Sequence, residues 1–360
     1  MRSYNRRDFL RTSLIGGAAI AWLNPVKTIS SVVTQENQRT QVSVISGSDR
    51  ADMAYRALQP FAKQIRRSIG NRRVVLKVNN VLIYVPLACT YVGTLEGILE
   101  FLKSIGKLRN VIIAESSASG STLEGFDNYG YYRLTSEYPV KLIDLDNEPF
   151  ETLYVIDEKD FRPHLVRVSR VILDKDSYVI SVARMKTHNT VGATLSLKNI
   201  VFGAPIKDKG FTLYSEDKRF SPLAKESKPG SVSYKRLLHG SGFHAVNYNI
   251  ASLAQKLHPH LAIIDGYEGM EGNGPTLGTA VDHRICVAST DWLAADRVGV
   301  ELMGIDFSRI GYLNYCSQMG LGVADLSKIE ITGENLKDHI KPYKLSDNFE
   351  KQWVWMNPKS

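Results

Sequence analysis

The residues best suited to chemistry lie in one short stretch, 184–192, which reads Arg-Met-Lys-Thr-His-Asn-Thr-Val-Gly. It follows an apolar run that predicts a strand over residues 178–184. If that strand continues, Arg184, Lys186 and His188 alternate onto a single face and converge on one site. Two cations beside an imidazole lower the pKa of the ring and favour its neutral form, which can act as a base. The alternative interpretation is a solvated basic strand edge.

Other cationic and amide side chains are expected to join this site. Lys198 and Asn199 lie on a helix predicted over 193–202, whose N-terminus adds a partial positive charge. Lys77 and Asn79 end an earlier apolar strand and, two residues apart, point to the same side of it. Together these groups predict a binding site for a small anion.

An acidic, glycine-rich segment forms a second candidate. Residues 265–275 read Asp-Gly-Tyr-Glu-Gly-Met-Glu-Gly-Asn-Gly-Pro and follow a strand predicted over 260–265. So many glycines describe a loop whose backbone comes close to a ligand. The residues of this loop expected to contact the substrate are Gly272, Asn273 and Gly274. Asp265 and Glu271 carry hard oxygen ligands, so they would bind a divalent cation or orient His188, unless they are simply solvated carboxylates.

These segments need a scaffold that brings strand ends together. Strands are predicted at 73–78, 110–115, 140–145, 178–184, 260–265, 284–288 and 328–332. Helices are predicted at 94–105, 193–202, 243–257 and 291–303. The alternation indicates an α/β fold with a mostly parallel sheet flanked by helices, in which ligands bind beyond the carboxyl ends of the strands.

The length of 360 residues allows one large domain or two joined lobes. We expect a single α/β domain over 40–335, or two lobes at 40–170 and 171–335 with a cleft between them. The polar stretch 206–240 is expected to be a lid or a surface insertion. Residues 336–360 are expected to be a C-terminal tail.

The N-terminus carries a basic segment followed by a short apolar run over 14–23. Arg6 and Arg7 precede Asp-Phe-Leu, and the apolar run is far shorter than the roughly 20 residues that a membrane span needs. Residues 1–30 therefore predict a twin-arginine signal peptide. We expect the twin-arginine machinery to export the folded chain to the periplasm or the exterior, with no membrane span in the mature form. The alternative is a basic tail before a buried helix.

Composition excludes several classes of function. Much of the formal net charge of +8 lies in residues 1–30, and no basic helix with interleaved aromatic residues follows, so a nucleic-acid partner is not expected. The cysteines, Cys89, Cys286 and Cys316, are far apart and form no Cys-x-x-Cys pair. A cysteine-ligated iron–sulfur cluster is therefore not expected.

With these motifs in view, the chain resembles the domain-of-unknown-function 362 family over residues 74–306. The matching motifs are Lys77 with Asn79, Lys186-Thr187-His188 with Gly192, Lys198-Asn199 with Gly203, the 265–275 segment and the helix from Asp291. The resemblance implies no assigned reaction. Some relatives add ferredoxin-like cysteine motifs, which this chain lacks. The lysine, histidine and glycine arrangement is also similar, as an analogy only, to nickel-pincer lactate racemases.

The leading hypothesis is an exported enzyme acting on a small carboxylate or phosphate. It would be an isomerase-like, racemase-like or lyase-like enzyme that depends on a metal or another cofactor. Lys77 and Lys186 would hold the anion, His188 would move a proton, and Lys198 would neutralise developing negative charge. One alternative is an extracytoplasmic protein that binds an anion without turnover. The other is an iron–sulfur or redox accessory protein.

Overall fold

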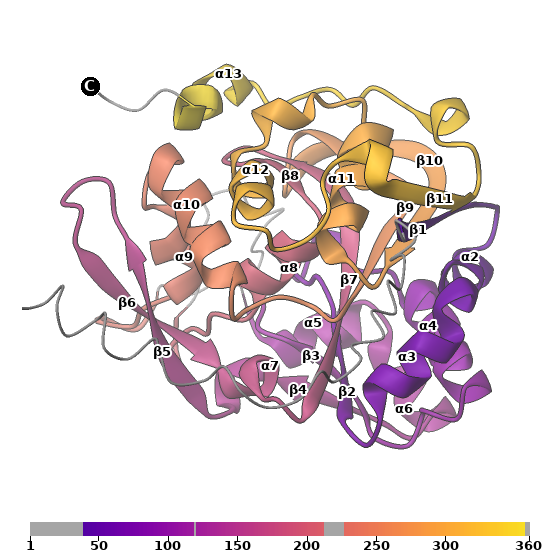
Figure 1. The fold of residues 1–360 in the computed structure, drawn as a ribbon. Coiled ribbons are helices and arrows are strands. Elements are labelled where there is room, and N and C mark those ends of the chain that lie inside the picture. The colour runs from indigo at the N-terminus through magenta and orange to yellow at the C-terminus, as the bar shows by residue number, and fades with distance from the viewer. Residues whose placement is uncertain (1–38, 119, 212–226, 357–360) are drawn as a thin grey trace, which may run out of the picture. The chain divides into compact units, whose positions relative to one another are not determined.

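The computed structural model describes residues 39–118, 120–211 and 227–356. The predicted signal peptide over 1–30 lies outside these residues, as does part of the polar stretch 206–240. From residue 39 onward the chain forms one compact unit built around a single large sheet (Figure 1). The predicted α/β fold is confirmed.

The central sheet has nine strands within the described residues. They are β1 (Thr40–Ser46), β2 (Arg73–Lys77), β3 (Val111–Glu115), β4 (Val140–Asp144), β7 (Ser177–His188), β8 (Gly192–Thr194), β9 (Leu261–Asn273), β10 (Leu277–Ser289) and β11 (Ile329–Gly333). The order is β11-β1-β10-β9-β7-β2-β3-β4, and β8 pairs with the end of β7. The run from β9 to β4 is parallel, whereas β10 pairs antiparallel with both β1 and β9.

Helices cover both faces of this sheet (Figure 1). One layer contains α2 (Arg50–Leu58), α3 (Ala62–Ile69), α4 (Val92–Ser104), α5 (Thr122–Asn128) and α6 (Tyr131–Glu137). The other contains α7 (Arg170–Leu173), α8 (Ser196–Gly203), α9 (Tyr234–His239), α10 (Phe243–Ala254), α11 (Trp292–Leu302) and α12 (Gly311–Gln318). A separate antiparallel hairpin, β5 (Phe150–Ile156) with β6 (Pro163–Ser169), packs with this second layer.

Strand alternation decides which layer each side chain meets. In β2, Val74 and Leu76 belong to the core under α2 to α6, whereas Val75 belongs to the core under α8 to α12. Lys77 has the same parity as Val75, so its side chain points toward α8. The lysine is thereby placed on the buried face where the next helix brings polar groups.

The glycine-rich segment 265–275 differs from its prediction. It is mostly strand β9, hydrogen-bonded to β10 along its length, rather than a free loop. Glycine permits close packing here, because a Cβ atom at Gly269 would lie 2.0 Å from the Tyr343 hydroxyl. One at Gly278, on the partner strand β10, would lie 2.2 Å from a backbone oxygen of β9. Since β9 also pairs with β7, the acidic and basic segments are neighbouring strands of one sheet and not opposite walls of a cleft.

The far end of β7 is closed by a tight turn. The strand continues to His188 as expected, and β8 folds back on it, so the next helix begins only at Ser196. Gln352, on helix α13 (Phe349–Gln352) near the C-terminus, accepts a hydrogen bond from Gly192 N at 2.7 Å and donates one to the His188 carbonyl at 3.3 Å. The described part of the C-terminal segment is thus packed against the end of the strand that carries His188.

Candidate functional site

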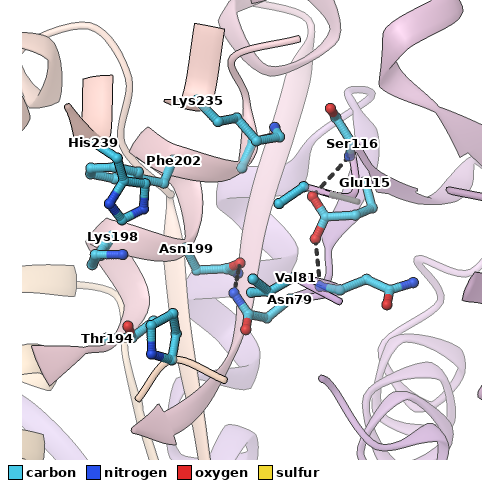
Figure 2. A pocket seen from close by; sticks show the side chains of 14 residues that line it. Asn79, Val81, Glu115, Ser116, Thr194, Lys198, Asn199, Phe202, Lys235 and His239 are labelled. Carbon is cyan, nitrogen blue, oxygen red and sulfur yellow. Dashed lines mark hydrogen bonds between the residues drawn. The ribbon is translucent and has the colours of Figure 1, made fainter. Parts of the chain in front are cut away.

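A pocket opens beyond the carboxyl ends of β2 and β3, where α8 and α9 approach the sheet (Figure 2). The charged, amide and imidazole side chains that line it include Asn79, Glu115, Lys198, Asn199, Lys235 and His239. The space that water can occupy is about 60 Å³. Because one water needs roughly 10–15 Å³ of such space, the pocket holds roughly four to six waters or one compact ligand.

A buried ion pair forms one wall. Lys77 Nζ lies 2.7 Å from Glu115 Oε1, and neither side chain is more than 3% exposed. The same carboxylate accepts hydrogen bonds from Asn80 N at 2.7 Å and Ser116 N at 2.8 Å. A Cβ atom at Gly203 would lie 2.1 Å from Lys77 Nζ, so only glycine leaves room for the lysine there. Glu115 is therefore fully engaged within the protein.

Two asparagines link the strand ends to helix α8. Asn79 Nδ2 donates to Asn199 Oδ1 at 2.9 Å (Figure 2), and Asn199 Nδ2 donates to the Lys77 carbonyl at 3.0 Å. Lys186 Nζ donates to Asn79 Oδ1 at 2.6 Å and to the Ala88 carbonyl at 2.6 Å. Lys186 has no carboxylate partner within the part of the chain that the structure describes, and burial lowers its pKa to about 7.

Lys198 is the least satisfied polar group of the site. Its side chain points into the pocket between His239 and Thr194 (Figure 2), and the residue is 4% exposed. Its ammonium lies over the Phe202 ring at 4.2 Å and hydrogen-bonds to none of the described residues. Burial, and then repulsion from Lys186, hold the Lys198 pKa well below its usual value.

Two stacked histidines stand next to this lysine. The His188 and His239 rings lie 5.2 Å apart at 17°. His188 Nδ1 accepts from Thr190 N at 3.0 Å, so the proton of the neutral ring is on Nε2, which has no hydrogen-bond partner among the described residues. Burial, followed by the charge of Lys198, lowers the pKa of both rings well below the ordinary value. Both are therefore neutral near pH 7 and able to accept a proton.

A further lysine comes from helix α9. Lys235 Nζ donates to the carbonyls of Gly203 and Pro205. Burial lowers the pKa of Lys235 to about 7, although Asp146 and Glu115 act in the opposite direction. Lys235 and His239 are one helical turn apart, which places both on the side of α9 that faces the pocket.

The predicted site residues fall into two groups. The structure brings Lys77, Asn79, Lys186, His188, Lys198 and Asn199 together at or directly behind the pocket. Arg184 lies outside the lining: its guanidinium is 2.8 Å from Glu268 Oε2 and donates to the Cys89 carbonyl at 3.2 Å. Its role in substrate binding stays a prediction.

The carboxylates of the acidic segment also lie outside the pocket lining. Asp265 Oδ2 accepts from Arg50 at 3.3 Å and Thr94 at 2.8 Å, and Glu271 Oε2 accepts from Lys344 N at 2.8 Å. Within the described residues, neither carboxylate bonds to His188, and no group of three or more His, Cys, Asp or Glu side chains could hold a metal ion.

The glycines of that segment make backbone hydrogen bonds to neighbouring chain segments. Gly272 N donates to the Lys344 carbonyl at 2.6 Å, and the Gly274 carbonyl accepts from Asn189 N at 2.8 Å. Asn273 exchanges hydrogen bonds with Asp347. Pro275, which follows Gly274, lines the pocket, so this segment reaches the site at its end.

Sequence reasoning gave no role to three residues of the site. Glu115 ends a predicted strand, and because ligands bind beyond the carboxyl ends of parallel strands, this position indicated a site residue. Lys235 and His239 lie on a short helix within the polar stretch 206–240, and their spacing of four residues was the available signal.

The fold and the pocket define an α/β protein with a small cationic site at the carboxyl ends of its parallel strands. The domain of unknown function DUF362 matches residues 74–301, more than half of the chain. The chain belongs to this family.

A curated relative shows a weaker similarity. The chain is 24% identical over 212 residues to the thylakoid-associated protein sll1697 of Synechocystis sp.. The match covers 58% of this chain and 56% of the relative, so the chain spans about half of that protein's length. In the described part of the chain, no helix is both long and apolar enough to cross a membrane.

Proposed function

We propose that this protein is an enzyme that acts on a small anionic substrate, a carboxylate or a phosphate, by acid–base chemistry of lysine and histidine. The observation that carries the proposal is Lys198, a buried lysine that lines a pocket and has no acceptor among the described residues. Burying an ammonium group without a partner is costly, so an anionic ligand is its natural counterpart.

The neighbouring groups suit proton transfer. His239 is neutral, lines the pocket and would accept or deliver the proton, with His188 stacked against it. Lys198 would hold the anionic group, and Lys77 and Lys186 would add positive potential behind it. Proton transfer beside a carboxylate is the chemistry of isomerases, racemases and lyases. A divalent cation at Asp265 and Glu271 stays a prediction, which metal analysis of the purified protein tests.

A protein that binds an anion without turnover is the second candidate. One observation favours it: within the described residues neither His188 nor His239 hydrogen-bonds to a carboxylate, the partner that commonly orients a catalytic histidine. In a binding protein the histidines would contribute little to affinity, whereas Lys198 would remain essential.

Turnover separates the two candidates. We expect the wild-type protein to convert at least one member of a panel of hydroxy acids and phosphate esters, and His239→Gln to lower kcat about 10²-fold or more while substrate binding survives. His164→Gln, on the β6 strand of the hairpin, is the matched control and should leave kcat unchanged. Unchanged binding with no conversion of any compound by the wild type would favour the binding protein.

We also propose that the chain is exported by the twin-arginine route and works in the periplasm or outside the cell. The support is the order of basic and apolar residues at the N-terminus. The thylakoid association named for the relative is compatible with a protein that works at or beyond a membrane.

Replacing both Arg6 and Arg7 with Lys tests this route. We expect the variant to accumulate in the cytoplasm while the wild type reaches the periplasm, as measured by cell fractionation and immunoblotting. Arg2→Lys is the control, since it keeps the paired arginines intact. Equal export of the double variant and the wild type would contradict the proposal.

A further inference from the structure

The carboxylate and amide oxygens at the pocket are already occupied. The oxygens of the lining carboxylate and amides receive bonds from within the protein: Glu115 from Lys77 and two backbone amides, Asn79 from Lys186, and Asn199 from Asn79. A ligand that offered mainly donors would find few free oxygens here. The pocket is therefore matched to a ligand that supplies acceptors.

Donors, in contrast, are left over. Lys198 Nζ has no acceptor among the described residues, and the buried Thr194 hydroxyl has no hydrogen-bond partner there. Both side chains line the same wall of the pocket, below His239 (Figure 2). Each unsatisfied buried donor costs free energy that an incoming oxygen would recover.

Buried lysines also outnumber the carboxylates that pair with them. Two buried lysines are balanced, Lys77 by Glu115 and Lys207 by Asp146. Three more, Lys186, Lys198 and Lys235, lie within ion-pair distance of no carboxylate in the described chain. Once these three lysines are protonated, a ligand with one negative charge leaves most of their positive charge uncompensated.

We propose that the pocket binds a compact oxyanion with two negative charges, and that its lysines take up at least one proton from solvent as the anion binds. This inference rests on the proposed function and names its ligand class. A phosphate or sulfate group and a small dicarboxylate share the required chemistry, and each is small enough for a cavity of about 60 Å³. A nucleotide is not.

The charged groups around Lys198 explain the proton uptake. The lysines and histidines are Lys77 on β2, Lys186 and His188 on β7, and Lys235 and His239 on α9. The carboxylates are Glu115 on β3 and Asp296 on α11. Glu115 and Asp296 are held by other donors, so cations and neutral rings dominate this space. The empty site therefore favours neutral lysines, as the lowered pKa values of Lys186 and Lys235, about 7, indicate. A bound dianion favours the charged forms.

Calorimetric titration with sulfate tests the inference. Sulfate has two charges and does not titrate near neutral pH, so any proton taken up must go to the protein. Titrations at pH 8 in buffers with different ionisation enthalpies give the number of protons directly. We expect uptake of about one proton for each sulfate bound, because at this pH lysines with a pKa near 7 are mostly neutral. Nitrate, a compact monoanion, should bind at least tenfold more weakly. Comparing the affinities for malonate and for phosphate shows whether a dicarboxylate or a phosphate group is the better ligand.

Variants make the result specific. Lys198→Gln should lose at least tenfold in sulfate affinity and reduce the proton uptake, whereas Lys175→Gln, an exposed lysine before β7, should change neither. Nitrate binding as tight as sulfate binding, or dianion binding without proton uptake, would overturn the inference. If substrates are converted but no dianion binds, the inference fails and the enzyme proposal stands. Dianion binding with proton uptake but no conversion of any compound would leave the inference and remove the enzyme.

Discussion

Lys198→Met is expected to make the protein more stable and to abolish its affinity for anions. Lys198 is almost fully buried, has no acceptor among the described residues, and contacts the Phe202 ring, which suits a methionine. Removing the desolvated amine should raise the free energy of unfolding at pH 7 by about 1–3 kcal/mol. The unpaired lysine destabilises the empty protein, so the substitution should stabilise the fold while it removes anion binding.

The pH dependence of this gain gives a second readout. The folded-state pKa of Lys198 is lowered, so between that pKa and the unfolded value the unfolded chain binds more protons and the penalty in the wild type falls as pH rises. The advantage of Lys198→Met should therefore shrink by up to about 1.4 kcal/mol per pH unit over this window. Urea unfolding of both proteins from pH 7 to 9 measures it. Lys175→Met, at an exposed site, should show no gain, and a Lys198→Met variant less stable than wild type would contradict the account.

Glu115→Gln is expected to have the largest destabilising effect of any single change at the site. Glu115 balances Lys77 at 2.7 Å inside the protein and accepts two backbone amides as well. The substitution leaves a buried lysine without its counter-charge, which typically costs about 3–5 kcal/mol. Denaturant unfolding should show this loss, whereas Glu330→Gln on the exposed side of β11 should change stability by less than about 0.5 kcal/mol.

A double variant separates the lost charge from simple loss of packing. Adding Lys77→Met to Glu115→Gln removes the uncompensated charge, so it should recover part of the lost stability. A double variant less stable than Glu115→Gln alone would show that the pair is not coupled in this way.

Much of the scaffold could be predicted from the sequence. Apolar runs such as Val111–Glu115 are long enough and β-branched enough to be buried strands, and α4, α10 and α11 carry apolar faces at helical spacing. Because parallel strands end at one edge, the polar residues after β2 and β7 could be expected to meet, and Lys77, Asn79 and Lys186 do.

The rest depended on tertiary contacts that local patterns do not encode. The number of glycines in this region suggests a loop. In the structure, the glycines at 266, 269 and 278 lie in strands, where another part of the chain comes too close for a side chain. Arg184 looks like a ligand-binding cation, yet its partner Glu268 is 84 residues away in sequence. His239 joins the site only because α9, within the polar stretch 206–240, packs against α8 through the contact of His239 with Phe202.

Crystallography can show whether a compact dianion binds next to Lys198. Selenate resembles sulfate and contains selenium, so an anomalous difference map from a crystal soaked in selenate shows where a compact dianion binds. We predict a selenium peak in the pocket between Lys198, Asn199 and Lys235, with an oxygen about 2.8 Å from Lys198 Nζ. Selenate peaks confined to the protein surface, with an empty pocket at saturating concentration, would contradict it.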